Sequence, residues 1–478
     1  MPKSIEADAA TGLTDSDVST LFRSLPAPVE ERTQAIGREI FESSRLTLFN
    51  RNFWYTQLLE LATSDLRVKT QLFRFVDVLP VLKTSQQKKE HLIEYLSPSA
   101  GAKKWPWILK VIVALLKVPG LDRLMVAIAD FQVRQMAKNF IVGNSWEQAW
   151  KKLQVARERK LAFTLDILGE TVFSEGEAEY YTEQYRQLID QIGRRKSELL
   201  PIKQIDEAAS GPIPAVNISL KLSALDCRMD PAAHEASVIR LIERVEPMMR
   251  LAVQRGVFIN FDMETFALRE IYRDVFKRIL MKEEFRRYRH FGIVVQAYQR
   301  TSLGDVHDWI RFARERGTPF TIRLVKGAYW DYEVIVAQQS SWLPPVYDYK
   351  FESDANYEEC TRAMLDAYPD IELAIGSHNV RSISHALAYA EWKKLPLSAL
   401  EVQMLYGMAD PFKDALVKRG VRVREYDPVG EMLPGLSYLV RRLLENSAND
   451  SFLKQSFMDK TGIRELLKTP QDKRSSSC

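Results

Sequence analysis

Four side chains near the carboxyl-terminal end of the chain have the spacing of one helix face and the chemistry of an anion clamp. Tyr438, Arg441, Arg442 and Glu445 stand at positions i, i+3, i+4 and i+7, while the apolar residues between them turn to the other side. Each guanidinium can fork onto a carboxylate, so this face suits a small anionic ligand beside an aromatic ring. The plainer interpretation is a solvated amphipathic helix with an i, i+4 charge pair.

Other residues that could bind or react follow short apolar runs earlier in the chain. They are Lys221; Asp262, Met263 and Glu264; Gln296 and Tyr298; Arg323, Val325, Lys326, Gly327, Ala328, Tyr329 and Trp330; Ser377, His378 and Asn379; Leu405; and Tyr426. Asp262 and Glu264 could bind a metal or act as acid and base. A metal centre would need more ligands, and only His378 is at hand, so we predict no metal. By itself, His378 also fits a structural, hydrogen-bonded histidine.

Two lysines admit more than one chemistry. Lys326 could form a Schiff base, as aldolases on barrel folds do. The following Gly327 and Ala328 instead favour close backbone approach to a large planar or phosphorylated ligand. Lys221 lies in an apolar frame, so it either extends to the surface or points into a pocket. Its alignment with the other strand ends favours the pocket.

The elements that must position these residues are alternating strands and helices. Eight β-rich runs are predicted as strands: 161–166, 216–220, 258–263, 293–298, 321–325, 372–375, 401–405 and 421–426. Helical stretches separate them, for example 233–255, 306–316, 357–367 and 383–394. Eight such units predict a closed (β/α)8 barrel, and no G-x-G-x-x-G supports the open nucleotide-binding alternative. Functional groups of barrels sit at the carboxyl ends of strands, so the polar residues should converge on one rim.

The chain divides into three predicted parts. Residues 1–155 read as a helical arm, residues 156–455 as the barrel with the Tyr438–Glu445 helix over its mouth, and residues 456–478 as a carboxyl-terminal tail. The fold class is therefore α/β, a TIM-type barrel preceded by an all-helical region.

Composition limits the partners. A net charge of +4 over 478 residues, without a long basic run, does not indicate nucleic acid. Cys227, Cys360 and Cys478 lack metal-ligand spacing and fit reduced thiols. The polar, acidic first 20 residues are unlike a secretory signal, so a cytoplasmic location is expected. Charges and a Pro-Gly pair interrupt the most apolar segment, 105–129, which favours a core helix pair over a membrane span and leaves contact with a membrane surface open.

These motifs together resemble the proline dehydrogenase family. The resemblance lies in Lys221-Leu-Ser-Ala-Leu, Asp262-Met-Glu, Gln296-Ala-Tyr, Arg323-Leu-Val-Lys-Gly-Ala-Tyr-Trp, Ser377-His-Asn, Leu405-Tyr-Gly-Met, Tyr426-Asp-Pro-Val-Gly and the helix 438–446. The motifs occur in family order over residues 158–455. The helices before them, including 134–137 and the run 165–171, resemble the proline dehydrogenase half of bifunctional proline utilization A.

The resemblance implies oxidation of L-proline to Δ1-pyrroline-5-carboxylate with non-covalently bound FAD. Arg441, Arg442 and Lys221 should hold the proline carboxylate, Asp262 should organise the cations, and Tyr329, Leu405, Tyr426 and Tyr438 should pack the ring. Arg323 should lie near the flavin N5, with Asp262 and Arg323 as the catalytic pair. The expected cofactor contacts are Met263, Gln296, Tyr298, Arg323, Val325, Lys326, Gly327, Ala328, Trp330, Ser377, His378, Asn379 and Glu445.

The resemblance also implies partners. A membrane quinone should accept the electrons, with the protein peripheral at the inner face of the membrane. The NAD-dependent aldehyde dehydrogenase half of the bifunctional family is not recognisable in this sequence. Either a separate pyrroline-5-carboxylate dehydrogenase consumes the product, as we expect, or the chain is a piece of a longer protein. Two alternatives remain on the residues alone: a Schiff-base aldolase that uses Lys326 or Lys221, and a non-catalytic helical scaffold.

Overall fold

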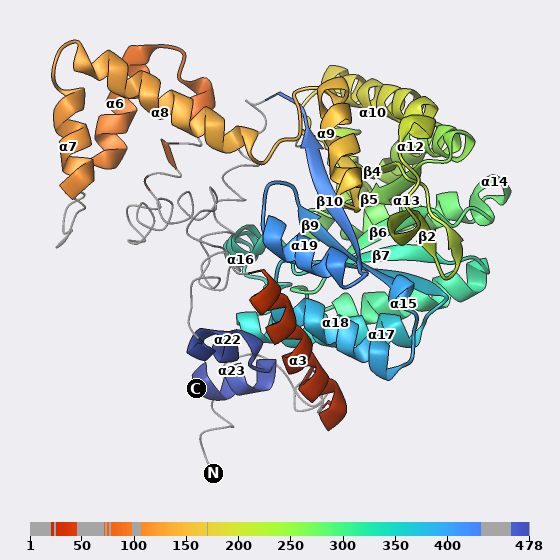
Figure 1. Cartoon of the computed structure of the whole chain (residues 1–478). Helices are drawn as coiled ribbons and strands as arrows, with labels where there is room; N and C mark the ends of the chain where they lie inside the picture. The colour runs from red at the N-terminus through yellow and green to blue at the C-terminus, as the bar shows by residue number, and fades with distance from the viewer. Residues whose placement is uncertain are drawn as a thin grey trace.

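Eight parallel strands close into a barrel, and helices cover its outside (Figure 1). The computed structural model describes residues 21–22, 25–44, 71, 74–75, 78–97, 107–169, 171–431 and 460–477. The barrel strands are β1 (Leu161–Ile167), β4 (Asn217–Leu220), β5 (Phe258–Phe261), β6 (Phe291–Gln296), β7 (Phe320–Val325), β8 (Ile371–Gly376), β9 (Leu400–Leu405) and β10 (Arg422–Val429). Their spatial order is β1-β10-β9-β8-β7-β6-β5-β4, and β4 pairs with β1 to close the ring. The predicted barrel and its eight strands are confirmed.

The remaining elements of the barrel domain connect these strands. A two-stranded antiparallel ribbon, β2 (Glu207–Ala208) and β3 (Gly211–Pro212), precedes β4. The helices are α10 (Glu175–Arg195), α11 (Lys203–Asp206), α12 (His234–Arg255), α13 (Arg269–Leu280), α14 (Glu283–Arg286), α15 (Ser302–Arg316), α16 (Trp330–Gln339), α17 (Lys350–Asp366), α18 (Val380–Trp392) and α19 (Asp410–Lys418). Gly256 and Gly317 end α12 and α15 in the left-handed conformation, with φ of 62° and 74°.

Aromatic rings fill part of the layer between the barrel and its helices. Phe276 on α13 lies edge-on to Phe261, Trp309 and Phe320, with ring centroids 5.3, 5.7 and 5.4 Å away. All four side chains are buried, which removes their apolar area from water. Edge-to-face contacts of this kind stabilise the fold beyond that burial. The core therefore anchors β5 and β7, which carry several of the predicted site residues, to the outer helices.

The helices outside the barrel form two groups. One comprises α3 (Ala27–Ser43), α22 (Lys460–Leu467) and α23 (Pro470–Ser477), which lie on the barrel beside α17 and α18 (Figure 1). The Arg381 guanidinium on α18 forks onto Glu30 of α3, with both N–O distances 2.9 Å. The other group is a lobe of α6 (Ser85–Leu96), α7 (Trp107–Leu116) and α8 (Leu121–Lys138), connected to the barrel through α9 (Trp146–Glu158). Within the described residues, no helix has the length and apolar character needed to cross a membrane.

Candidate active site

Most of the predicted site residues lie at the carboxyl ends of the barrel strands. Lys221 directly follows β4, Asp262 and Met263 follow β5, Gln296 ends β6, and Leu405 ends β9. Tyr426 was expected at the end of the last strand, but β10 continues to Val429 and Tyr426 stands in register with Leu405. The register of parallel strands thus brings these residues to one mouth, as the sequence predicted.

A buried hydrogen-bonded network holds Arg323 and Asp262 together. Arg323 on β7 donates from Nη1 to Asp262 Oδ1 at 2.6 Å and from Nη2 to Ser219 Oγ at 3.0 Å. The Tyr426 hydroxyl donates to the other Asp262 oxygen, Oδ2, at 2.6 Å. Arg323 is only 4% exposed, so its charge is balanced by a fixed carboxylate rather than by water. Burial raises the pKa of Tyr426 well above its ordinary value, so its hydroxyl keeps the proton that it donates.

Arg323 also meets Tyr426 and retains an unused donor. Its guanidinium lies 5.4 Å from the centre of the Tyr426 ring. Its Nε–H is buried without a hydrogen-bond partner in the described part of the chain. Buried N–H groups in proteins are nearly always satisfied, so this donor needs an acceptor that the described residues do not supply.

A second ion pair lies beside this network. Lys221 Nζ contacts Asp166 Oδ1 on β1 and donates to the Ile167 carbonyl at 3.4 Å. Burial opposes the ammonium charge, but Asp166 and Asp262 outweigh it and raise the pKa of Lys221. The lysine therefore stays protonated and presents a cation at the mouth. It points into the barrel, as predicted, and does not extend along the surface.

Gln296, at the end of β6, forms hydrogen bonds with residues that follow β5 and β6. Gln296 Nε2 donates to the Glu264 carbonyl at 3.0 Å, and Gln299 donates to Gln296 Oε1 at 2.7 Å. The Glu264 carboxylate accepts from the Tyr272 hydroxyl at 3.0 Å. Asp262 and Glu264 therefore have separate partners and do not form a joint carboxylate site. The described residues contain one group with metal-ligand spacing, Glu175, Asp226 and Cys227, and it lies outside the predicted site.

The loop after β7 contains a close backbone approach. Gly327 has φ of +125°, and a Cβ there would lie 2.4 Å from the Tyr298 ring. The glycine was interpreted as making room for a ligand, but the nearest group that it accommodates is this tyrosine. Lys326 pairs with Asp354 on α17, and the Trp330 indole donates to the Tyr347 carbonyl at 2.8 Å. Both side chains are thus positioned by α17 and the segment before it.

The motif after β8 supports both a helix and the neighbouring strand. Asn379 caps α18 by accepting from the Ser382 amide at 3.0 Å, and Ser377 Oγ accepts from the Asn379 amide at 3.0 Å. His378 Nε2 accepts from the backbone amide of Leu405 at 3.0 Å, which assigns the ring proton of a neutral His378 to Nδ1. The motif therefore connects the ends of β8 and β9 at the mouth.

The sequence prediction missed some residues of the site, and some predicted residues fall outside the part of the chain that the structure describes. Asp166 and Ser219 belong to the networks at the mouth, and Asp354 supports Lys326, yet none was predicted. Asp166 could have been predicted from the sequence, because it is a carboxylate near the end of an apolar strand, as Asp262 is. Asp354 had no such signal, since it lies within a helix, α17, and not at a strand end. The predicted clamp of Tyr438, Arg441, Arg442 and Glu445 falls outside the described residues.

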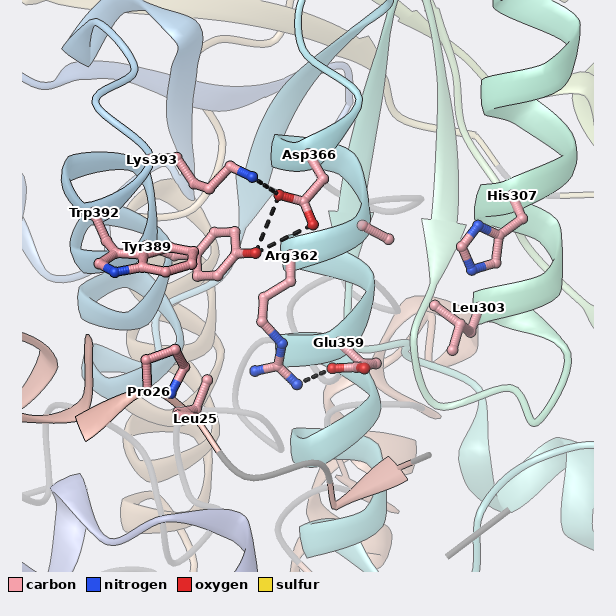
Figure 2. A pocket seen from close by; sticks show the side chains of 11 residues that line it. Leu25, Pro26, Leu303, His307, Glu359, Arg362, Asp366, Tyr389, Trp392 and Lys393 are labelled. Carbon is pink, nitrogen blue, oxygen red and sulfur yellow. Dashed lines mark hydrogen bonds and ion pairs between the residues drawn. The ribbon is translucent and has the colours of Figure 1, made fainter. Parts of the chain in front are cut away.

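A cavity of about 710 Å³ lies elsewhere, on the outer helix layer. Its lining includes Leu25, His307, Arg362 and Trp392, and Figure 2 shows Arg362 turned toward Glu359 and Tyr389 toward Asp366. It is formed by α15, α17, α18 and the residues before α3, away from the strand ends. None of the predicted site residues lines it.

Comparisons with known proteins identify the family to which the chain belongs. The family model described as proline dehydrogenase matches residues 149–455, and the model described as proline utilization A N-terminal domain matches residues 30–140. The bifunctional protein PutA of Klebsiella aerogenes is 30% identical over 348 residues, which are 71% of this chain and 26% of that protein. Proline dehydrogenase 1 of Bacillus subtilis (strain 168) is 25% identical over 332 residues, which are 69% of this chain and 93% of that protein.

A solved structure is similar over nearly the whole chain. Proline utilization A from Bdellovibrio bacteriovorus, inactivated by N-propargylglycine, superposes with a TM-score of 0.84 and 40% identity. The alignment covers 93% of this chain and 44% of that one. The chain thus spans about a quarter of the length of the PutA relatives and less than half of this solved structure.

Proposed function

This chain belongs to the proline dehydrogenase family, and from that premise we propose that it oxidises L-proline to Δ1-pyrroline-5-carboxylate with a bound FAD. The observation that carries the proposal is that the family match and the ion pairs at the barrel mouth lie in the same part of the chain. The family match over residues 149–455 spans the barrel whose mouth holds the Arg323–Asp262 and Lys221–Asp166 pairs.

The substrate carboxylate is proposed to bind Lys221. The charge on that ammonium is sustained by Asp166 and Asp262, and Lys221 directly follows β4 at the barrel mouth. Arg441 and Arg442 are proposed to complete the clamp, because a pair of guanidiniums can fork onto one carboxylate and fix its orientation. Fixing the charged end sets the position of the carbon beside the ring nitrogen.

The pyrrolidine ring is proposed to pack against Tyr329, Leu405, Tyr426 and Tyr438. The ring of Tyr426 is held in place by its hydroxyl bond to Asp262, so its apolar face is fixed before substrate arrives. Such walls exclude water from the reacting carbon. The substrate amine must be unprotonated when the hydride leaves, and the cations at the mouth disfavour a second positive charge there.

The cofactor is proposed to lie across the mouth, next to Arg323. When bound, FAD supplies the hydride acceptor for this reaction. The unused buried Nε–H of Arg323 and its charge suit an electron-rich ring nitrogen. Gln296 is proposed to contact the ring edge. The remaining cofactor contacts are proposed to be Met263, Tyr298, Val325, Lys326, Gly327, Ala328, Trp330, Ser377, His378, Asn379 and Glu445.

Partners follow from the proposed chemistry. The reduced cofactor must pass its electrons on, and we propose a membrane quinone as the acceptor and peripheral association with the membrane. The product hydrolyses to a semialdehyde, so a pyrroline-5-carboxylate dehydrogenase is proposed to consume it.

The aldolase alternative rests on Lys326. Burial lowers the pKa of Lys326 to about 8, which is a property of Schiff-base lysines. However, its amine is paired with Asp354, which also accepts from Lys350 at 3.0 Å. Treatment with borohydride and a carbonyl substrate tests this alternative, because a trapped adduct on Lys326 would support it.

Dye-linked turnover tests the main proposal. The purified chain, loaded with FAD, is incubated with L-proline and a soluble electron-accepting dye, and the product is trapped with o-aminobenzaldehyde. We expect dye reduction and trapped product in equal amounts with L-proline and neither with D-proline. Absence of both with L-proline, in a folded chain that retains FAD, would refute the proposed activity.

A further inference from the structure

Asp166 and Asp262 are the carboxylates of the two ion pairs at the barrel mouth, and they differ in how their oxygens are used. Asp262 accepts from Arg323 at Oδ1 and from the Tyr426 hydroxyl at Oδ2, both at 2.6 Å. Asp166 contacts Lys221 through Oδ1, whereas its Oδ2 is buried and has no hydrogen-bond partner among the described residues. Buried carboxylate oxygens normally accept hydrogen bonds, so the open Oδ2 is the oxygen of the two pairs that can receive a proton.

The surroundings of Asp166 favour the uptake of a proton. The groups that interact with it are the ammonium of Lys221, the carboxylate of Asp262, the Tyr426 hydroxyl on β10 and the Tyr185 hydroxyl on α10. Burial is the largest influence and raises the pKa of Asp166; Asp262 adds to the rise, and Lys221 opposes it. A carboxylate in such a place binds a proton more readily than one in water, which is the property of a general base.

Lys221 connects Asp166 to the proposed substrate. This lysine directly follows β4 at the mouth and is proposed to hold the proline carboxylate. The amine of proline is attached to the same carbon as its carboxylate, so a carboxylate held by Lys221 brings the amine into the neighbourhood of Asp166. At neutral pH the free amine carries a proton, and this proton must leave before the nitrogen can support the departure of a hydride.

We propose that Asp166 is the catalytic base that takes the proton from the bound proline ammonium. An N–H bond of the ammonium breaks and an O–H bond forms at Asp166 Oδ2, so the carboxyl becomes neutral and the nitrogen keeps the electron pair. That pair forms the C=N bond as the hydride leaves the neighbouring carbon with both electrons of its C–H bond, and the protonated imine results. The proton on Asp166 returns to solvent after the product leaves.

This inference rests on the proposed function and divides the work between the two carboxylates. Asp262, whose oxygens are both bonded, holds Arg323 and Tyr426 in place. Asp166 handles the proton. The competing possibility is that no residue acts as the base, and that the chain binds only the small fraction of proline that solution has already deprotonated.

The pH dependence of kcat/KM for L-proline distinguishes these possibilities. It is measured by dye-linked turnover of the FAD-loaded chain between about pH 5 and 10, a range that spans the pKa values of carboxyl and amine groups. The wild-type value should level off once Asp166 is ionised, because the bound ammonium can then be deprotonated. The value for Asp166→Asn should instead rise about tenfold per pH unit up to the pKa of the proline amine. At neutral pH the variant should be roughly 100- to 10,000-fold below wild type, and the gap should close as pH rises.

Control variants separate this effect from damage to the fold. Asp226→Asn removes another buried carboxylate, which pairs with Arg240 at 2.9 Å outside the mouth, and it should keep the wild-type plateau. Lys221→Met keeps Asp166 but removes the cation that lowers its pKa, so the plateau should begin at a higher pH. If Asp166→Asn does not fold with FAD, the double variant Lys221→Met/Asp166→Asn, which leaves neither charge unpaired, takes its place and should show no plateau.

A plateau that persists without Asp166 would overturn the proposal, because another group would then take the proton. Parallel profiles for wild type and Asp166→Asn would overturn it as well, since a purely structural loss lowers kcat/KM equally at every pH. Absence of L-proline oxidation by the wild-type chain at every pH would refute the proposed function and this inference with it. Normal oxidation by the wild type with either of the first two results would refute the role of Asp166 alone.

Discussion

Replacing Lys221 with methionine should weaken both the fold and the grip on substrate, and a second change should separate the two effects. Asp166 is fully buried and its charge is balanced by Lys221. Removing one partner of a buried ion pair costs about 3–5 kcal/mol, because the other charge is left uncompensated. The proposed contact with the proline carboxylate is a charged hydrogen bond, worth about 2–3 kcal/mol, so KM for proline should rise roughly 30- to 150-fold.

The double variant Lys221→Met/Asp166→Asn is the decisive comparison. It removes both charges, so denaturant unfolding should show that most of the lost stability returns. The KM should remain high, because the cation for the carboxylate is still missing. If the double variant regained both stability and wild-type KM, Lys221 would be only a structural partner of Asp166. Wild-type stability in the single variant would refute the argument from burial.

Three further predictions concern other parts of the chain. Arg323→Lys keeps the charge but cannot bond Asp262 and Ser219 together, so FAD should be reduced more slowly or retained less tightly; unchanged reduction and retention would count against its role. Arg441→Met and Arg442→Met should each raise KM for proline strongly and leave the bound flavin spectrum intact, and unaltered kinetics in both would refute the clamp. Burial lowers the pKa of His385 to about 4, whereas an unfolded histidine has a pKa of about 6.5, so the unfolded chain takes up the proton first as pH falls. The free energy of unfolding should therefore decline by about 3 kcal/mol between pH 7 and 4 because of this residue. That decline should be absent in His385→Gln and unchanged in His307→Gln, a control at an exposed histidine.

The barrel could be predicted because each strand left a local signal. Runs such as 321–325 are short and β-rich, and the helices between them end at glycines such as Gly317, where only a residue tolerant of positive φ fits well. The mouth followed from topology, since parallel strands bring their carboxyl ends together. Strand ends were less predictable, as Tyr426 shows, because pairing with neighbours sets where a strand stops.

The partners of the site residues were harder to predict than the residues themselves. Asp166 pairs with Lys221 across 55 positions of sequence, and Asp354 contacts Lys326 from near the start of α17. Neither pairing has a periodic signature, because it depends on how strands and helices align in three dimensions. Gly327 was singled out for the right reason, close approach, but the sequence could not show that Tyr298 is the group that approaches it.

The absorbance spectrum of the purified chain, recorded before and after anaerobic addition of L-proline, tests the central claim most directly. The account predicts a yellow protein whose flavin band is bleached by L-proline and persists with D-proline. A well-folded chain that has no chromophore and acquires none from added FAD, or one whose flavin band L-proline leaves unchanged, would contradict it.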